Sequence, residues 1–105
     1  MGKITNPIEL YGYKAKTTFW QDFTIADAFG KAAVVDTYKR AMRDWKSNYI
    51  YLTELVLVLN HKIWQWHLKN TELEHTYHTL WSQCSEYAET HLKGDELMYF
   101  YDITD

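Results

Sequence analysis

The sequence predicts an all-α fold, a small helical bundle around an antiparallel hairpin of two long helices. Three observations support this prediction. From residue 31 to residue 93, apolar residues recur at steps of three and four, which is the period of a helix with one buried face. Threonines that stand three residues before Gln, Asp or Glu mark several helix starts. The chain of 105 residues, with a single cysteine, has room for one domain built without disulfides.

Residues 1–17 form an N-terminal segment for which we expect poor order, and residues 18–105 form the single helical domain. The segment holds the only proline, Pro7, and two of the four glycines. Its stretch IELYGYKAK is compatible with a short extended piece over the core. In TFWQ and TIAD, a threonine three residues before Gln or Asp predicts one or two short helices ahead of Gly30.

Residues 31–46 are predicted to form an amphipathic helix with one buried face. Its apolar members share an arc of about 120° on a helical wheel: Val34, Val35, Tyr38, Ala41, Met42 and Trp45. On the outer face, Asp36, Arg40 and Asp44 follow one another at the i, i+4 spacing of exposed ion pairs. Ser47 or Asn48 can cap the helix that follows.

The two long helices are predicted at residues 48–69 and 71–93. The first carries an apolar stripe so broad that we expect a central helix with several neighbours. A narrow strip that includes Glu54, Val58 and Lys62 is expected to face solvent. After Asn70, the sequence TELE forms a capping box that begins the second helix, so a short turn joins two antiparallel helices. Gly94 can end this helix in the left-handed conformation, and a short docked helix follows.

Four of the five histidines lie within eighteen residues around this turn, which makes a metal-binding helical protein one alternative. Imidazole and carboxylate suit zinc, and EHTYH places His75 and His78 one turn apart. With His67 they are the candidate metal ligands. Their wheel positions argue against this alternative, because His75 and His78 project from a polar face and His67 falls on the apolar face of the preceding helix. We expect surface histidines, one interior histidine and no cofactor.

A nucleic-acid-binding regulator is another alternative. The segment IADAFGKAAVVDTYKRA has small residues four apart, as in a helix-turn-helix motif, and a basic helix face follows, formed by Lys39, Arg40, Arg43 and Lys46. Asp36, however, stands where that motif needs an apolar anchor, and Asp44 interrupts the basic face. The net charge of −3 gives no overall attraction to a polyanion. A row of charges like this one is more often a solvated helix surface.

The function class that the sequence favours is a non-enzymatic protein. The sequence contains no Gly-rich phosphate loop, no Gly-x-Ser-x-Gly elbow and no Cys-x-x-Cys pair. No secretory signal is recognisable, and the longest aliphatic run is far shorter than the roughly 20 residues of a membrane span, so we expect a cytoplasmic protein without membrane contact.

Aromatic residues give the best indication of what such a protein does. Five Trp, nine Tyr and four Phe exceed what a small core requires. Because aromatic rings are enriched at protein interfaces, we predict a small protein–protein interaction or accessory protein, with homodimerisation as one form of that interaction. Exposed tryptophans would favour this prediction, and five buried tryptophans would remove its basis.

Four segments of the chain resemble one family: FWQDFTIADAFG, DTYKRA, YLTELVLVLNHKIW and THLKGDELMYFY. It is a family of short uncharacterised all-helical proteins from gut Bacteroidetes and related bacteria, often encoded near mobile elements. The resemblance spans about residues 18–105, nearly the whole chain. It implies an all-helical cytoplasmic protein, and it implies no activity, cofactor or site residue.

Overall fold

Most of the chain is helical, as the apolar spacing predicts. The computed structural model describes residues 9–10 and 12–104. Its α-helices are α1 (Phe19–Asp27), α2 (Lys31–Trp45), α3 (Tyr49–Ile63), α4 (Glu72–His91) and α5 (Asp95–Thr104). A 3-10 turn, η1 (Trp66–Leu68), lies between α3 and α4, and β1 (Glu9–Leu10) pairs antiparallel with β2 (Tyr13–Lys14). Within the described residues, no helix is both long and apolar enough to cross a bilayer.

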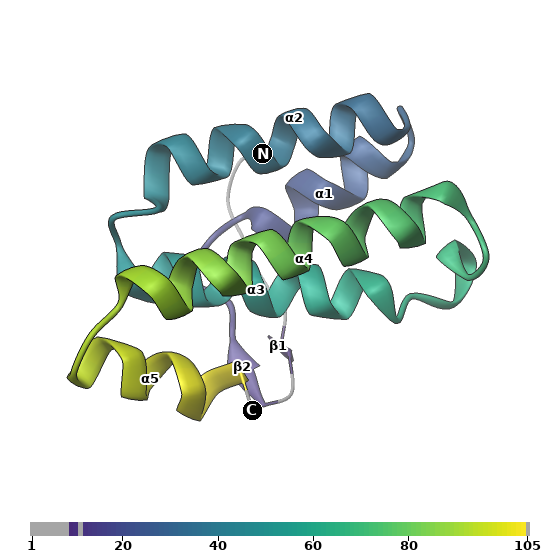
Figure 1. Ribbon diagram of the computed structural model, residues 1–105. Coiled ribbons are helices and arrows are strands. Elements are labelled where there is room, and N and C mark those ends of the chain that lie inside the picture. Colours follow the sequence, from purple (N-terminus) through teal and green to yellow (C-terminus); the bar gives the residue numbers. More distant parts are fainter. Residues whose placement is uncertain (1–8, 11, 105) are drawn as a thin grey trace.

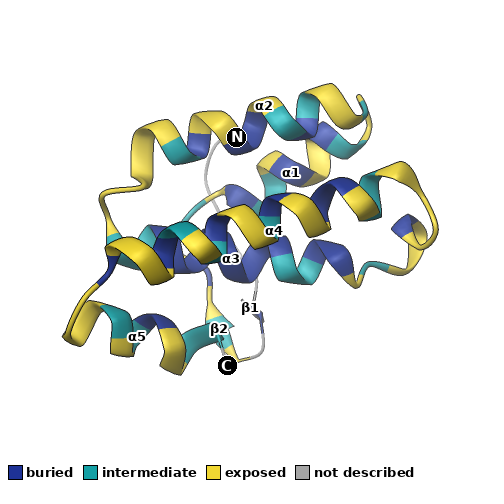
Figure 2. Ribbon diagram, viewed as in Figure 1, coloured by how far each residue is buried: buried dark blue, intermediate teal, exposed yellow. Residues whose placement is uncertain are grey.

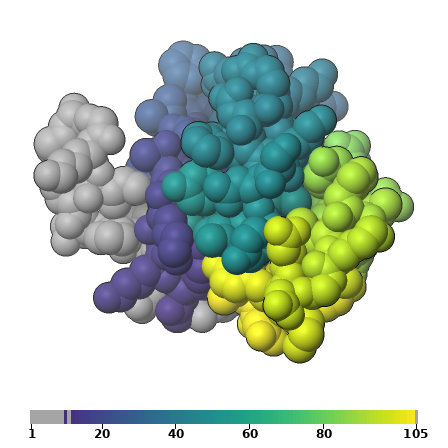
Figure 3. All heavy atoms as spheres, turned by 90° about the vertical axis from the view of Figure 1, so that its left-hand side faces the viewer, coloured from purple at the N-terminus to yellow at the C-terminus, as the bar shows by residue number. Residues whose placement is uncertain are grey.

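The long helices α3 and α4 lie side by side and antiparallel, and the other elements pack around them (Figure 1). The helices α1 and α2 form a second hairpin on one side of this pair, and α5 with the β-hairpin lies on the other (Figure 1). Figure 3 views the end of the bundle where α2 leads into α3 and α4 leads into α5. The predicted bundle around an antiparallel hairpin is therefore confirmed.

The central helix is α3, because it contacts α1, α2, α4, α5 and β1. Every residue from 52 to 59 is buried (Figure 2). The prediction that Glu54, Val58 and Lys62 face solvent is therefore wrong: their exposed fractions are 0%, 0% and 1%. A helix surrounded on all sides has no solvent face, and the two charged residues reach partners on neighbouring elements instead.

Glu54 ties the N-terminal segment to the core. Its carboxylate accepts hydrogen bonds from the backbone N–H groups of Lys16 (2.7 Å) and Thr17 (2.9 Å), from the Thr17 hydroxyl, and from the Tyr13 hydroxyl at 3.2 Å. These donors satisfy a buried carboxylate just ahead of α1, where the dipole of that helix also favours negative charge. We expect poor order for residues 1–17, and of these, residues 1–8 and 11 lie outside the described residues. Within residues 13–17, Tyr13, Lys16 and Thr17 are held by Glu54.

The first long helix ends at Ile63, six residues before the predicted end at Lys69. The chain then turns through η1, so that Leu68 packs into the core at 3% exposure. Asn70 adopts a left-handed backbone conformation (φ 63°), which Asn tolerates better than most residues, and this completes the reversal into α4. A helix continued to Lys69 would leave no length of chain for this turn.

Polar side chains cap α3 and α4 at the predicted places. The caps expected from TFWQ and TIAD do not form, because Thr18 makes no capping hydrogen bond with its side chain and Thr24 lies inside α1, where its hydroxyl donates to the Trp20 carbonyl. Asn48 Oδ1 accepts hydrogen bonds from the N–H groups of residues 50 and 51, at 3.1 and 3.2 Å. Thr71 Oγ1 accepts from Glu74 N at 3.3 Å, and Glu74 Oε1 accepts from Asn70 N at 2.9 Å. The capping box is thus present with its return bond shifted by one residue. Gly94 has the predicted left-handed conformation, with φ 60°, but α4 already ends at His91, so Gly94 lies directly before α5 and does not cap α4.

Candidate functional site

A groove between α1 and α2 gathers exposed apolar side chains. Ile25 and Phe29 lie at one end, 62% and 77% exposed, and Trp45 lies at the other, 41% exposed. Two adjoining hollows of about 230 and 280 Å³ form the groove, and both are lined by Asp22, Thr37 and Arg40. On the α1 side the lining residues run from Phe19 to Phe29, so the groove is roughly 15 Å long.

The local sequence explains why this face is apolar. Phe19, Phe23 and Ala26 turn the inner face of α1 into the core, while Ile25 lies on its outer face. Gly30, with φ 104°, reverses the chain after Phe29 into α2. The residues of α2 that line the groove include three with small side chains, which leave space between the two helices: Ala33, Thr37 and Ala41.

Charged residues edge this groove and are mostly paired. Arg40 lies 3.8 Å from Asp36, as the i, i+4 spacing predicts, whereas Asp44 is held by Arg43 rather than by Arg40. The hydrogen bond from Arg43 Nε at 2.9 Å lowers the pKa of the Asp44 carboxyl. Asp22 accepts a hydrogen bond from the hydroxyl of Thr18 at 3.1 Å. Because these pairs are exposed, they contribute little to stability and remain free to rearrange.

Two more tryptophans are exposed at the connection between α3 and α4. Trp64 is 62% exposed and Trp66 is 85% exposed, and Lys69 Nζ lies 5.6 Å from the centre of the Trp64 ring. This connection and the α1–α2 turn lie at the same end of the bundle (Figure 1), where Lys31 and Glu72 approach to 3.9 Å. Three of the five tryptophans are therefore exposed, which is the outcome that favours an interaction protein.

A buried ion pair lies where α1, α3 and α4 meet. Lys62 Nζ is 2.6 Å from Asp27 Oδ2, 3.3 Å from Thr24 Oγ1 and 4.7 Å from the centre of the Trp20 ring. The Tyr77 hydroxyl donates a hydrogen bond to Asp27 Oδ1, and burial together with this carboxylate raises the pKa of Tyr77. Because Lys62 is 1% exposed, no substrate reaches it. The cluster joins three helices.

The candidate metal ligands His67, His75 and His78 are all exposed. The expectation that His67 lies on an apolar helix face is wrong, because α3 ends at Ile63 and η1 turns His67 to solvent. His78 packs edge-on against the Trp81 ring, with 6.0 Å between ring centres. Within residues 9–10 and 12–104, no three or more His, Cys, Asp or Glu side chains are arranged to hold a metal ion.

The predicted basic residues fall on two sides of α2. Lys39, Arg43 and Lys46 line a groove between α2 and α4, whereas Arg40 turns to Asp36 beside α1. The groove consists of two hollows of about 280 and 430 Å³ that share Tyr38 and Lys39 in their lining. The basic face is thus one wall of a groove whose other wall is α4.

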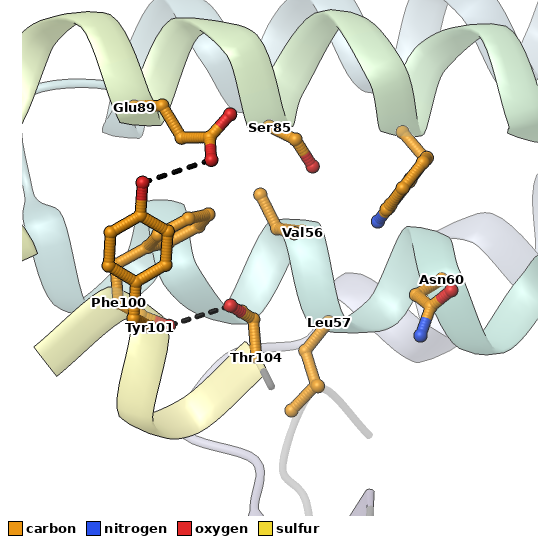
Figure 4. A pocket seen from close by; sticks show the side chains of 9 residues that line it. Val56, Leu57, Asn60, Ser85, Glu89, Phe100, Tyr101 and Thr104 are labelled. Carbon is orange, nitrogen blue, oxygen red and sulfur yellow. Dashed lines mark hydrogen bonds between the residues drawn. The ribbon is translucent and has the colours of Figure 1, made fainter.

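A smaller pocket of about 190 Å³ opens between α3, α4 and α5 (Figure 4). Val56 and Phe100 contribute apolar walls, and the Tyr101 hydroxyl donates a hydrogen bond to Glu89 at 3.0 Å along one edge. The Ser85 hydroxyl also lines this space. Since sites for small molecules usually exceed about 300 Å³, we regard the pocket as a packing feature at the docked end of α5.

Comparison with known proteins identifies no relative. No protein-family model, curated protein or solved structure matches the chain. The resemblance to a family of gut Bacteroidetes proteins therefore stays a prediction, and functional inference rests on the surface of this molecule.

Several features of these surfaces were not predicted from the sequence. The exposure of Ile25 and Phe29 was missed, although a wheel that places Phe19, Phe23 and Ala26 on one face of α1 leaves Ile25 on another. The contribution of α4 to the basic groove has no local signal, because it depends on how two helices align in space.

Proposed function

We propose that this chain is a non-enzymatic protein-interaction module that receives a helical segment of a partner protein in the α1–α2 groove. The observation that carries the proposal is the exposure of Ile25, Phe29 and Trp45 along one groove. Soluble proteins seldom expose several large apolar side chains along one groove unless a partner covers them, and Trp is a frequent anchor of interfaces.

The shape of the groove supports a helical occupant. Two packed helices present ridges between which a third helix can lie, with axes about 8–10 Å apart. A groove roughly 15 Å long accommodates about three helical turns. Covering the exposed parts of Ile25, Phe29 and Trp45 is worth roughly 1–2 kcal/mol each before the cost of association is subtracted.

Site-specific crosslinking tests the proposal. A photoreactive amino acid replaces Phe29 or Trp45 in the producing cell, and the exposed Asp102 on α5 is the control position. We expect both groove positions to crosslink to the same protein, with no such product from position 102. Equal products from all three positions, or none from the groove, would overturn the proposal. A product with twice the mass of the chain identifies a second copy as the partner.

A further inference from the structure

The groove between α2 and α4 has a lining of one charge sign. Four of the eleven Lys and Arg residues line it, together with His75: Lys31, Lys39, Arg43 and Lys46. Among the residues that line either hollow there is no carboxylate. In a chain of net charge −3, this lining is a local positive surface.

Acidic neighbours neutralise this groove in part. Glu72 lies 3.9 Å from Lys31 Nζ, and Asp44 holds Arg43 from the other side of α2. Lys39 and Lys46 form no ion pair with any residue that the structure describes. These two ammonium groups therefore remain available to an anionic partner.

Apolar side chains also line the same groove. Val35, Tyr38 and Met42 of α2 face Leu80 and Tyr87 of α4 across it. A ligand that matches both features carries negative charges along one edge and apolar side chains along the next. An amphipathic acidic peptide has this arrangement, whereas a simple anion has no apolar part.

The spacing of the cations fits a helical peptide. Lys39, Arg43 and Lys46 stand at i, i+4 and i+7, so they share one edge of α2 over about 10 Å. A helix with acidic residues at the same spacing aligns a carboxylate with each cation. Electrostatic attraction of this kind speeds association and selects the partner more than it adds affinity.

From these features we infer that the α2–α4 groove is a second binding site, and that it takes an acidic amphipathic peptide segment of a partner protein. Nucleic acid fits less well. Single-stranded binding sites use aromatic rings with free faces for base stacking. Tyr38 is only 8% exposed, and Tyr87 stacks on His91 with ring centres 3.9 Å apart.

Fluorescence anisotropy with a designed probe tests this inference. The probe is a labelled 15-residue alanine-based helix with Glu at i, i+4 and i+7 and Leu on the adjoining face. At about 50 mM salt we expect saturable binding that weakens as salt is raised. The variant Lys39→Glu/Lys46→Glu should weaken binding at least tenfold. The control Lys14→Glu/Lys93→Glu makes the same change in net charge at two exposed positions outside the groove and should bind as the unmodified protein does.

Three outcomes would overturn the inference. The first is no binding at low salt, the second is equal weakening by the groove and control variants, and the third is tighter, groove-dependent binding of a single-stranded oligonucleotide. Phe29→Ser separates this result from the proposed function, because it changes the α1–α2 groove and should leave the affinity for the peptide unchanged. Circular dichroism confirms that each variant is folded.

Discussion

Replacing Lys62 by Met tests the role of the buried ion pair. Met keeps an unbranched apolar stem and removes the ammonium group that lies 2.6 Å from Asp27 Oδ2. Breaking a buried pair by removing one partner costs about 3–5 kcal/mol, because the remaining charge loses its compensation. Asp27 keeps the hydrogen bond from Tyr77, so we expect the lower end of this range, about 3 kcal/mol.

The loss is large for a protein of this size. A 105-residue domain unfolds with an entropy of about 0.22 kcal/mol/K, so 3 kcal/mol lowers the melting temperature by about 14 °C. The double variant Lys62→Met/Asp27→Asn removes both charges, and its amide oxygen still accepts the hydrogen bond from Tyr77. We therefore expect it to be more stable than Lys62→Met alone by at least about 1 kcal/mol.

Urea unfolding followed by circular dichroism at pH 7 measures these differences. Lys93→Met, at an exposed position between α4 and α5, is the matched control and should stay within about 0.5 kcal/mol of the unmodified protein. A loss below about 1 kcal/mol for Lys62→Met would refute the account of the ion pair. So would a double variant that is less stable than Lys62→Met.

Three further predictions concern single positions. Glu54→Gln turns an amide NH₂ toward backbone N–H donors and should cost about 2 kcal/mol in urea unfolding; a change under about 0.5 kcal/mol would contradict the role given to Glu54. Thr71→Ala removes the cap of α4 and should cost about 1 kcal/mol, while Thr90→Ala, at an exposed position in the last turn of the same helix, should cost less than half as much. Burial raises the pKa of the Cys84 thiol, which lowers its thiolate fraction at pH 8, so a thiol reagent should react after unfolding in urea and not before; rapid reaction of the folded protein would disagree.

The fold could be predicted from the sequence because its signals are local. The capping box at Thr71 marks the start of α4, and Asn48 marks the start of α3. The apolar spacing of α2 also places its buried residues Val34, Tyr38 and Ala41 correctly, whereas Trp45, predicted on the same face, is 41% exposed. Such signals depend on neighbours within four residues, which a single sequence displays.

The charged residues of α3 could not be placed in this way. On a helical wheel Glu54 and Lys62 fall on a polar face, yet their hydrogen-bond partners Tyr13, Thr17 and Thr24 lie 37 to 41 residues away in sequence. A polar side chain can be buried in a core when distant groups satisfy its hydrogen bonds. Only the packing of the N-terminal segment and α1 onto α3 reveals those groups.

The end of α3 was missed for a related reason. The steps of three and four continue past Ile63 to Trp66, so the pattern extends a helix that the structure ends. The turn through η1 depends on burying Leu68 and leaves Trp66 in solvent, which is a balance set by tertiary packing. That same turn exposes His67 and separates it from the predicted apolar face.

A native mass spectrum of the untagged protein from cell extract tests the central claim, that the α1–α2 groove receives a protein partner. The spectrum is compared with that of the variant Ile25→Ser/Phe29→Ser, which removes the exposed apolar end of the groove, and with that of Asp102→Ser as control. We predict a species of the chain bound to a second protein, present for the unmodified protein and the control and absent for the groove variant. A bare monomer in all three spectra, or a complex that survives in the groove variant, would contradict the claim.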